Sequence, residues 1–212
     1  MQPPRSSICV ICGTRAAVTV DHVPPKCFFK GVANAQLRTV PACEICNNGA
    51  SSDDEDVRVY ISAQIGKGNS ASAALWDDGA YRTLKRKLKL RQALLANARE
   101  VLVREEDGTT TSRLSFHVPI STYQRVFERC TRGLYFFHSG RILPSNVPVS
   151  ATMLAGIPDL DTNEIRILNV ETVGDGACVY RYGITHEDLN TSIWIYEFHK
   201  AHWALVTTGD AE

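Results

Sequence analysis

The sequence predicts an α+β fold, in which a small N-terminal element of two strands and a helix, stabilised by a metal ion, precedes an α+β domain with an antiparallel sheet. Three observations predict this arrangement. Two CxxC pairs lie about thirty residues apart, which suits a zinc site. β-prone runs lie between the pairs, and an acid-rich helical segment follows them. Beyond residue 100, short apolar runs separated by turn residues surround one amphipathic stretch.

The composition is that of an ordinary globular protein. Of the 212 residues, 44% are hydrophobic and 22% are charged, which excludes disordered, collagen-like and fibrous chains. Lysine plus arginine and aspartate plus glutamate both number 23, so the formal net charge is zero. A protein that coats nucleic acid by its overall charge is therefore excluded, and any nucleic-acid contact needs locally segregated cations.

Nothing in the sequence indicates a membrane partner. The longest uncharged stretch, residues 142–158, contains three prolines and cannot cross a bilayer as a helix. The N-terminal residues lack the apolar core of a signal peptide. The seven cysteines are an odd number, which does not suit a disulfide framework. We therefore expect a cytoplasmic protein whose thiols are reduced or bind metal.

The cysteines fall into two pairs and three single positions. The pairs supply four thiolates, which suit a closed tetrahedral Zn²⁺ site of structural role. These are Cys9, Cys12, Cys43 and Cys46. A redox role for one CxxC pair is the alternative, but two pairs this close together favour zinc. The single cysteines are expected to be buried thiols: Cys27, Cys130 and Cys178.

Two strands are expected between the cysteine pairs. Residues 16–20 are β-prone and end at Asp21 and His22. The segment 23–26 contains two prolines, which cannot donate to a strand ladder, so a loop begins there. Residues 35–40 form the second expected strand. The order is therefore strand, loop, strand and cysteine pair.

A helix is expected from Cys46 onward, with acids at 53–56 in an early turn, where the helix dipole favours them. This order of elements predicts that Asp21 and Asn47 approach each other. A carboxylate and an amide oxygen are ligands that suit Mg²⁺. His22 points the opposite way along a regular strand, and a distortion at the strand end would bring it to the same site.

This pattern resembles the HNH endonucleases with a ββα-metal fold, and most closely the zinc-bearing type of phage Holliday-junction-resolving endonucleases. In that type too, an Asp-His pair lies between two CxxC pairs, and an asparagine follows the last cysteine. The resemblance covers about residues 8–60, roughly a quarter of the chain. The residues that carry it are Cys9, Cys12, Asp21, His22, Cys43, Cys46 and Asn47.

The resemblance implies a metal-dependent endonuclease that hydrolyses phosphodiester bonds in DNA, or alternatively in RNA. His22 would be the general base that activates water. Asp21 and Asn47 would hold one catalytic Mg²⁺ or Mn²⁺, which stabilises charge on the phosphorus centre and on the leaving 3′ oxygen. The zinc would remain structural.

One position departs from the family pattern. The family has a further asparagine about five residues before the third cysteine, which braces the loop that carries the histidine. Here those positions are Arg38 and Thr39, so Thr39 or a backbone group substitutes, or the loop is held differently. This departure motivates the alternative function, a non-catalytic zinc-stabilised module that binds nucleic acid or protein. Four polar residues near the helix start either add outer ligands or only cap the helix. They are Asn48, Ser51, Asp54 and Glu55.

A run of cations without an acid extends over residues 81–99. The helical period places four of them on one face: Arg82, Lys85, Arg86 and Lys89. It places three leucines on another face: Leu84, Leu88 and Leu95. The cationic face and the loop lysine Lys26 are expected to contact nucleic-acid phosphates. Lys30 is either a further phosphate contact or, as Lys26 alternatively is, a solvated loop lysine. The alternative is a solvated face whose charge is balanced by the acids at 53–56.

The chain divides by these features into a zinc-bearing element at 1–66, a basic linker helix at 67–100 and an α+β domain at 101–212. In this last domain a hairpin is expected around residues 106–108, followed by a helix that begins at Ser121 and ends before Gly140. Four further strands are expected at 165–170, 178–182, 193–198 and 203–207. No second catalytic constellation is visible there, and His199 and His202 are expected to be structural.

Overall fold

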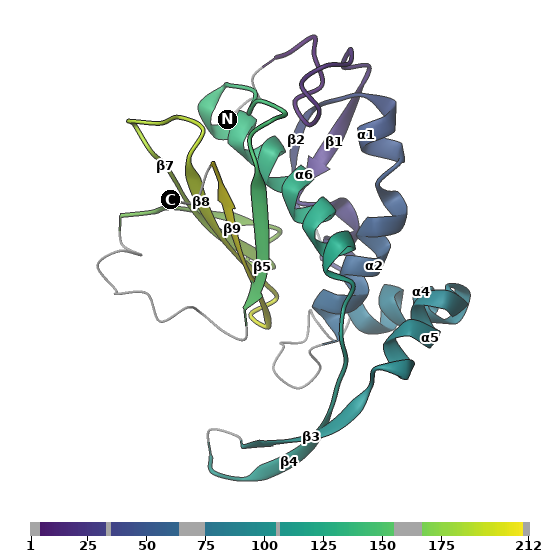
Figure 1. Ribbon diagram of the computed structural model, residues 1–212. Helices are drawn as coiled ribbons and strands as arrows, with labels where there is room; N and C mark the ends of the chain where they lie inside the picture. Colours follow the sequence, from purple (N-terminus) through teal and green to yellow (C-terminus); the bar gives the residue numbers. More distant parts are fainter. Residues whose placement is uncertain (1–4, 33–34, 64–74, 105–106, 155–166, 210–212) are drawn as a thin grey trace.

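A helix of 20 residues, α6 (Ile120–Ser139), runs through the middle of the molecule (Figure 1). On one side it packs against a five-stranded sheet, and on the other against the N-terminal strands and helices. The computed structural model describes residues 5–32, 35–63, 75–104, 107–154 and 167–209. Within these residues, no helix has the length and apolar character needed to cross a membrane.

The ends of α6 follow the sequence in part. Gly140 closes the helix with φ of 70°, and its N–H donates to the Phe136 carbonyl, as the sequence predicts. The N-terminal cap lies two residues earlier than expected, since Pro119 takes this position and Ser121 lies within the first turn.

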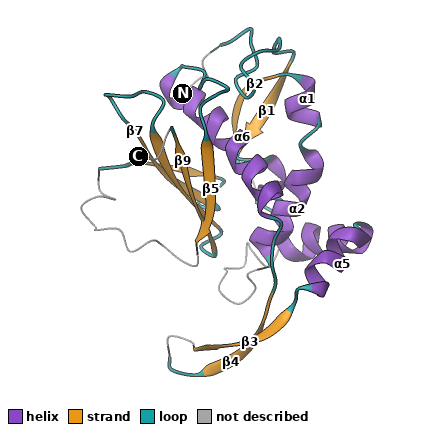
Figure 2. Ribbon diagram, viewed as in Figure 1, coloured by secondary structure: helices purple, strands orange, loops and turns teal. Residues whose placement is uncertain are grey.

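The sheet is antiparallel throughout, with strand order β5-β9-β8-β7-β6 (Figure 2). Its strands are β5 (Val149–Leu154), β6 (Asn169–Val173), β7 (Cys178–Ile184), β8 (Ser192–Phe198) and β9 (His202–Thr208). The last three match the expected strands. The expected strand at 165–170 overlaps only the start of β6, and positions 165–166 lie outside the described residues. β5 was not predicted, because its short run of small and polar residues lies among prolines.

Aromatic side chains fill the space between the sheet and α6. Trp194, Tyr196 and Phe198 alternate along β8 and are fully buried on the face toward α6. Phe127 of α6 meets Tyr196 edge to face, with ring centroids 5.5 Å apart. This side of the molecule therefore has a conventional core that needs no metal.

The two histidines of the HxxH spacing belong to this core. Both are fully buried. The Nε2 atom of His202 lies 2.9 Å from the Tyr123 hydroxyl, and that of His199 lies 2.9 Å from the Phe28 carbonyl oxygen. Their positions agree with the structural role that the sequence predicts.

The N-terminal element has the expected order with shifted bounds. It comprises β1 (Thr19–Val23), η1 (Lys26–Phe29), β2 (Arg38–Ala42), α1 (Glu44–Asn48) and α2 (Ser51–Ser62). The expected strand end at Asp21 and His22 is wrong, since both residues lie inside β1 and pair with Val40 and Thr39 of β2. β2 also runs on through Pro41, whose carbonyl points away from β1 and accepts from the Val10 N–H, so the missing proline N–H costs no hydrogen bond to β1.

The basic segment is not one helix. It contains a π-helical turn η2 (Trp76–Ala80), α4 (Tyr81–Arg86), α5 (Leu88–Ala96) and the start of the hairpin β3 (Arg99–Arg104) with β4 (Thr110–Ser115). The chain leaves helical geometry at Lys87, where ψ is 77° and the ammonium group bonds Asp56 at 2.5 Å. The expected leucine face is therefore wrong: Leu90 and Leu94 are buried, whereas Leu88 and Leu95 are exposed.

Candidate metal centre and adjoining acid–arginine cluster

The two CxxC pairs meet in space. The sulfur atoms of Cys9, Cys12, Cys43 and Cys46 all lie within 4.8 Å of one another, and these residues could hold a metal ion such as zinc. Tetrahedral Zn²⁺ with Zn–S bonds of about 2.3 Å separates its sulfurs by about 3.8 Å, so the four thiols need only a small contraction around an ion. We call these four residues the cysteine cluster.

The two halves of the cysteine cluster are built alike. The N–H of Gly13 donates to the Cys9 carbonyl at 2.8 Å, and the N–H of Asn47 donates to the Cys43 carbonyl at 3.0 Å. Each pair therefore sits on a turn that closes at the residue after its second cysteine. Gly13 has φ of 68°, a conformation that glycine adopts without strain.

Hydrogen-bond donors favour the thiolate form of Cys12 and Cys43, whereas burial raises the pKa of Cys9 and Cys46. The Arg15 Nη1 atom donates to the Cys43 sulfur at 3.4 Å, and the Thr14 hydroxyl donates to the Cys12 sulfur at 3.5 Å. Burial raises the pKa of Cys12, but hydrogen bonds from Thr14, Arg15 and Cys9 together outweigh it and lower this pKa to about 6. A thiolate is the form that binds metal.

Asn47 docks the helix that follows the cysteine cluster onto β1. Its amide nitrogen donates to the Thr19 hydroxyl at 3.0 Å and to the Val20 carbonyl at 2.9 Å. The residue after Val20 is Asp21. The structure therefore brings Asn47 next to the strand that carries the Asp-His pair, and the two bonds to the amide nitrogen fix which way its oxygen points.

Asp21 and His22 do not share a face. β1 pairs with β2 in continuous register from Thr19 to Val23, so the distortion expected at the strand end is absent. Asp21 is buried beneath α6, and His22 is half-buried on the other side of the strand. The His22 backbone N–H nevertheless donates to Asp21 Oδ1 at 2.8 Å, which fixes the orientation of the carboxylate.

Arg129 of α6 binds two acids at this point. Its Nε atom lies 3.1 Å from Asp21 Oδ2, and its Nη2 atom lies 2.6 Å from Asp54 Oδ1. The Asp21 Oδ2 and Arg129 Nε atoms are buried and make no hydrogen bond, so their contact is an ion pair of imperfect geometry. We call Asp21, Asp54 and Arg129 the acid–arginine cluster.

Burial controls the acids of this cluster. It raises the pKa of Asp21, with the opposing attraction of Arg129 too weak to offset it. Burial also raises the pKa of Asp54 to about 6. The charge of Arg129 and its hydrogen bond to Asp54 oppose this rise but do not cancel it. Two carboxylates and one guanidinium leave the site with an excess of negative charge when both acids are ionised.

The remaining acids of α2 are also paired. The partners of the four acids at 53–56 are Arg125 for Asp53, Arg129 for Asp54, Arg86 and Lys87 for Glu55, and Lys87 for Asp56. The sequence left open whether the acids at 53–56 neutralise the basic run at 81–99. They do so at Arg86 and Lys87.

The other cations expected at nucleic acid are on the surface. Lys26, Arg82, Lys85 and Lys89 are exposed. The ammonium group of Lys85 lies 4.5 Å from the Tyr81 ring centre, over the ring face. Their contact with nucleic acid stays a prediction.

Positions 38 and 39, where the family has a bracing asparagine, have separate partners. Arg38 donates to Glu171 of β6 at 2.8 Å and lies over the Phe137 ring, so it ties β2 to the sheet side of the molecule. Thr39 lies opposite His22 in the β1–β2 register. Thr39, and not Arg38, is thus the neighbour of the histidine.

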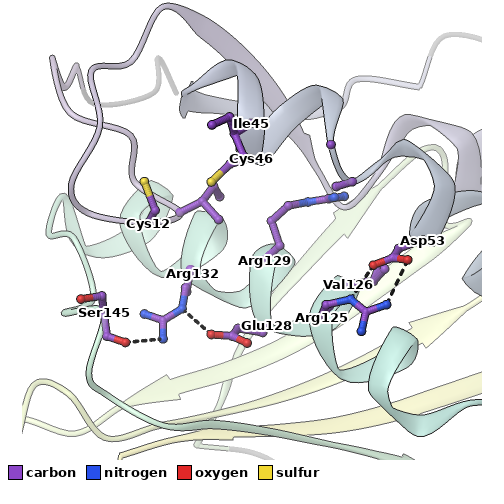
Figure 3. A pocket seen from close by; sticks show the side chains of 13 residues that line it. Cys12, Ile45, Cys46, Asp53, Arg125, Val126, Glu128, Arg129, Arg132 and Ser145 are labelled. Atoms are coloured by element: carbon purple, nitrogen blue, oxygen red, sulfur yellow. Dashed lines mark hydrogen bonds and ion pairs between the residues drawn. The ribbon is translucent and has the colours of Figure 1, made fainter.

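A cleft of about 460 Å³ opens between the cysteine cluster and α6 (Figure 3). Cys12 and Cys46 lie on one wall, and arginines of α6 lie on the other. The guanidinium of Arg132 is held by Glu128 and by carbonyl oxygens of residues 143–147. Arg125 is held by Asp53. The arginines of this cleft are therefore occupied by partners within the chain.

Sequence reasoning missed Arg129, because no local pattern links it to residues so far away along the chain. The only available signal is the buried position of an arginine on the apolar face of a predicted helix. Comparison of the chain with protein-family models, curated proteins and solved structures gives no match.

Proposed function

We propose that this protein is a metal-dependent endonuclease of the HNH type that hydrolyses phosphodiester bonds in DNA, or alternatively in RNA. The observation that carries the proposal is the docking of Asn47 onto β1. Its two hydrogen bonds bring a residue next to the last cysteine against the strand of Asp21 and His22. An isolated zinc turn requires no such contact.

His22 is the proposed general base. Its imidazole is half-buried, which leaves one side open to water and a phosphate, and its backbone is fixed by pairing with Thr39. A positioned histidine that takes a proton from water contributes about 10²- to 10⁴-fold to a hydrolysis rate.

The donor set suits the proposed divalent ion. Asn47 is anchored through its nitrogen and so offers an oxygen of the type that Mg²⁺ and Mn²⁺ prefer. Asp21 Oδ2 makes no hydrogen bond but is buried in the ion pair with Arg129 Nε, so a divalent ion would have to displace that guanidinium to reach it. Such an ion, when bound, would stabilise charge on the phosphoryl and leaving oxygens. Asp54, which already faces Arg129, supplies the negative charge that balances the guanidinium beside Asp21.

The cysteine cluster has a structural role in this proposal. A bound zinc would hold the start of α1 against the first turn of the chain, and so keep Asn47 in reach of β1. Four cysteine ligands leave zinc no open position for substrate, which supports a site apart from the chemistry.

The test compares cleavage of supercoiled plasmid and of single-stranded DNA and RNA by wild type and by His22→Ala, with Mg²⁺ or Mn²⁺ added. We expect wild-type cleavage and a loss of about 10²-fold or more in the variant. His186→Ala is the matched control, because His186 is an exposed histidine on the sheet side. Cleavage that survives His22→Ala in a pure, zinc-replete preparation would show that His22 is not the base.

A non-catalytic zinc-stabilised module that binds nucleic acid or protein is the second candidate. The observation that favours it is the ion pair between Arg129 and Asp21, which places a positive charge where a catalytic cation is required. In the same experiment this candidate gives no cleavage by any variant. It also gives nucleic-acid binding that weakens steeply with added salt.

A further inference from the structure

A second concave surface lies beside η1, and its charged residues are all cations. It encloses about 560 Å³, within the range of small-ligand sites. Its cations are Lys26, Lys30 and Arg58, and none of the described residues that line it is acidic. We call this surface the lysine pocket.

Arg58 is the unusual member of the lysine pocket. It is only 6% exposed, and its Nη2 atom donates to the Thr83 hydroxyl at 2.6 Å and to the Gly79 carbonyl at 3.3 Å. Its Nε atom is buried without a hydrogen bond. Glu55, one turn earlier on α2, is bonded to Arg86 instead. Within the described part of the chain, no carboxylate lies within ion-pair distance of Arg58.

The Glu55 carboxylate feels the charge of Arg58, which helps to lower its pKa, but it is hydrogen-bonded to Arg86, so the buried Arg58 guanidinium has no ion pair of its own and can take an anion. The chain makes room for this guanidinium, since a Cβ atom at Gly79 would come within 3.0 Å of Arg58 Cζ and Nη1. The two hydrogen bonds hold the group in one orientation. Lys26 and Lys30 at the rim are exposed, and their ammonium groups can donate hydrogen bonds to the same anion.

The rest of the lining is apolar. Phe29, Val32, Ala35 and Leu37 supply this wall. Cations on one side and an apolar wall on the other match a ligand that joins a phosphate to a flat, weakly polar ring system. An inorganic anion would use only the cations.

The lysine pocket adjoins the acid–arginine cluster. Cys27 lines the pocket. Arg58 of the pocket and Asp54 of the cluster lie one turn apart on α2, so the two sites are neighbours. Lys26 follows the proposed base His22 by four residues.

We propose that the lysine pocket binds one nucleotide unit of the substrate strand, with its phosphate at Lys26, Lys30 and Arg58 and its base on the apolar wall. The inference rests on the proposed function and specifies it, because a base can enter such a pocket only from an unpaired stretch of nucleic acid. The substrate is then a strand with at least one unpaired nucleotide beside the cleaved bond.

The experiment measures binding without cleavage, in the His22→Ala background. Calorimetry with dAMP, deoxyadenosine and inorganic phosphate tests the pocket itself. Anisotropy with a labelled single-stranded oligonucleotide and the corresponding blunt duplex tests the source of the nucleotide. The pocket variant is Lys26→Gln with Lys30→Gln, since both side chains are exposed and the fold does not depend on them. The matched control is Arg104→Gln with Arg141→Gln, two exposed cations on other elements.

We expect dAMP to bind more tightly than deoxyadenosine or phosphate, and single strand more tightly than duplex. The pocket variant should weaken dAMP and single-strand binding by about tenfold or more, because two charge-assisted contacts are lost. The control should change neither affinity by more than about twofold. Phosphate binding equal to that of dAMP would overturn the role of the apolar wall. Equal affinity for single strand and duplex would overturn the unpaired substrate.

The two proposals fail separately. Absence of wild-type cleavage together with pocket-dependent dAMP binding would refute the nuclease and leave the nucleotide pocket standing. Cleavage that depends on His22, with dAMP binding unaffected by the pocket variant, would refute the pocket alone.

Discussion

Replacing Asp54 by asparagine tests the charge balance of the acid–arginine cluster most directly. Asp21 and Asp54 place two negative charges against the single positive charge of Arg129, and all three side chains are at most 15% exposed. Burial raises the pKa of Asp54 to about 6, although Arg129 attracts the carboxylate and donates to it. The Asp54→Asn variant leaves a one-to-one pair of Asp21 and Arg129.

The size and sign of the effect follow from the pKa in each state. The Asp54 carboxyl has a pKa of about 6 in the folded protein and an ordinary value of 3.8 when unfolded. Between these values the folded protein binds more protons, so its stability falls as the pH rises. Between about pH 5 and about pH 7.5, this group alone lowers the free energy of unfolding by about 1.4 kcal/mol. The Asp54→Asn variant has no carboxyl group at this position, so its free energy of unfolding does not fall for this reason as the pH rises.

Urea unfolding of both proteins across this pH range measures the difference. Buried histidines such as His199 and His202 titrate alike in the two proteins, so their contributions cancel when the free energies of unfolding are subtracted. Asp107→Asn is the control, because Asp107 lies on the distant β3–β4 hairpin and is fully exposed. We expect the variant to gain about 1.4 kcal/mol relative to wild type as the pH rises. A constant difference, or a relative gain by wild type, would show that Arg129 outweighs burial and would refute the reasoning.

Three further predictions follow from single contacts. Cys43→Ser with Cys46→Ser should abolish the binding of about one zinc equivalent, measured by metal analysis, and unfold the N-terminal element; retained zinc would contradict the cysteine cluster. Gly133→Ala should lower the free energy of unfolding by about 1–3 kcal/mol, because the added Cβ would lie 2.7 Å from Val23 Cγ1. Val23→Ala should restore part of that loss, and no rescue would assign it to another cause. Asn47→Ala should speed amide exchange in β1 and reduce cleavage, whereas unchanged exchange would argue against the docking role.

The cysteine cluster and most strands could be predicted because their signals are local. Ligand type and spacing within each CxxC pair define half of a metal site before any fold is known. The sheet side has a strand that alternates buried and half-buried residues, β9, and glycines such as Gly174 and Gly176 mark the turn between β6 and β7.

The acid–arginine cluster could not be predicted, because it joins residues on three separate elements. The local sequence predicts a turn or metal-binding role for Asp21 and a helix-capping role for Asp54. Each role explains its residue without a contact to a distant arginine. Only the packing of α6 reveals that both carboxylates meet the same guanidinium. The break at Lys87 has a similar cause, since the contact of its ammonium group with α2 competes with an otherwise helical sequence.

The pairing along α6 also changes where nucleic acid is expected. Arg125, Arg129 and Arg132 lie on one face of α6 and bind acids or carbonyl oxygens of other elements, so these cations join the parts of the protein. Arg86 serves the same purpose against α2. A phosphate that bound any of these arginines would have to displace an internal partner and lose its contribution to stability. The cations of the lysine pocket have no acid among its described lining residues, so an anion that bound there would break no internal ion pair. The pattern of ion pairs, more than the number of cations, is therefore the reason we propose the lysine pocket as the surface that would receive a phosphate.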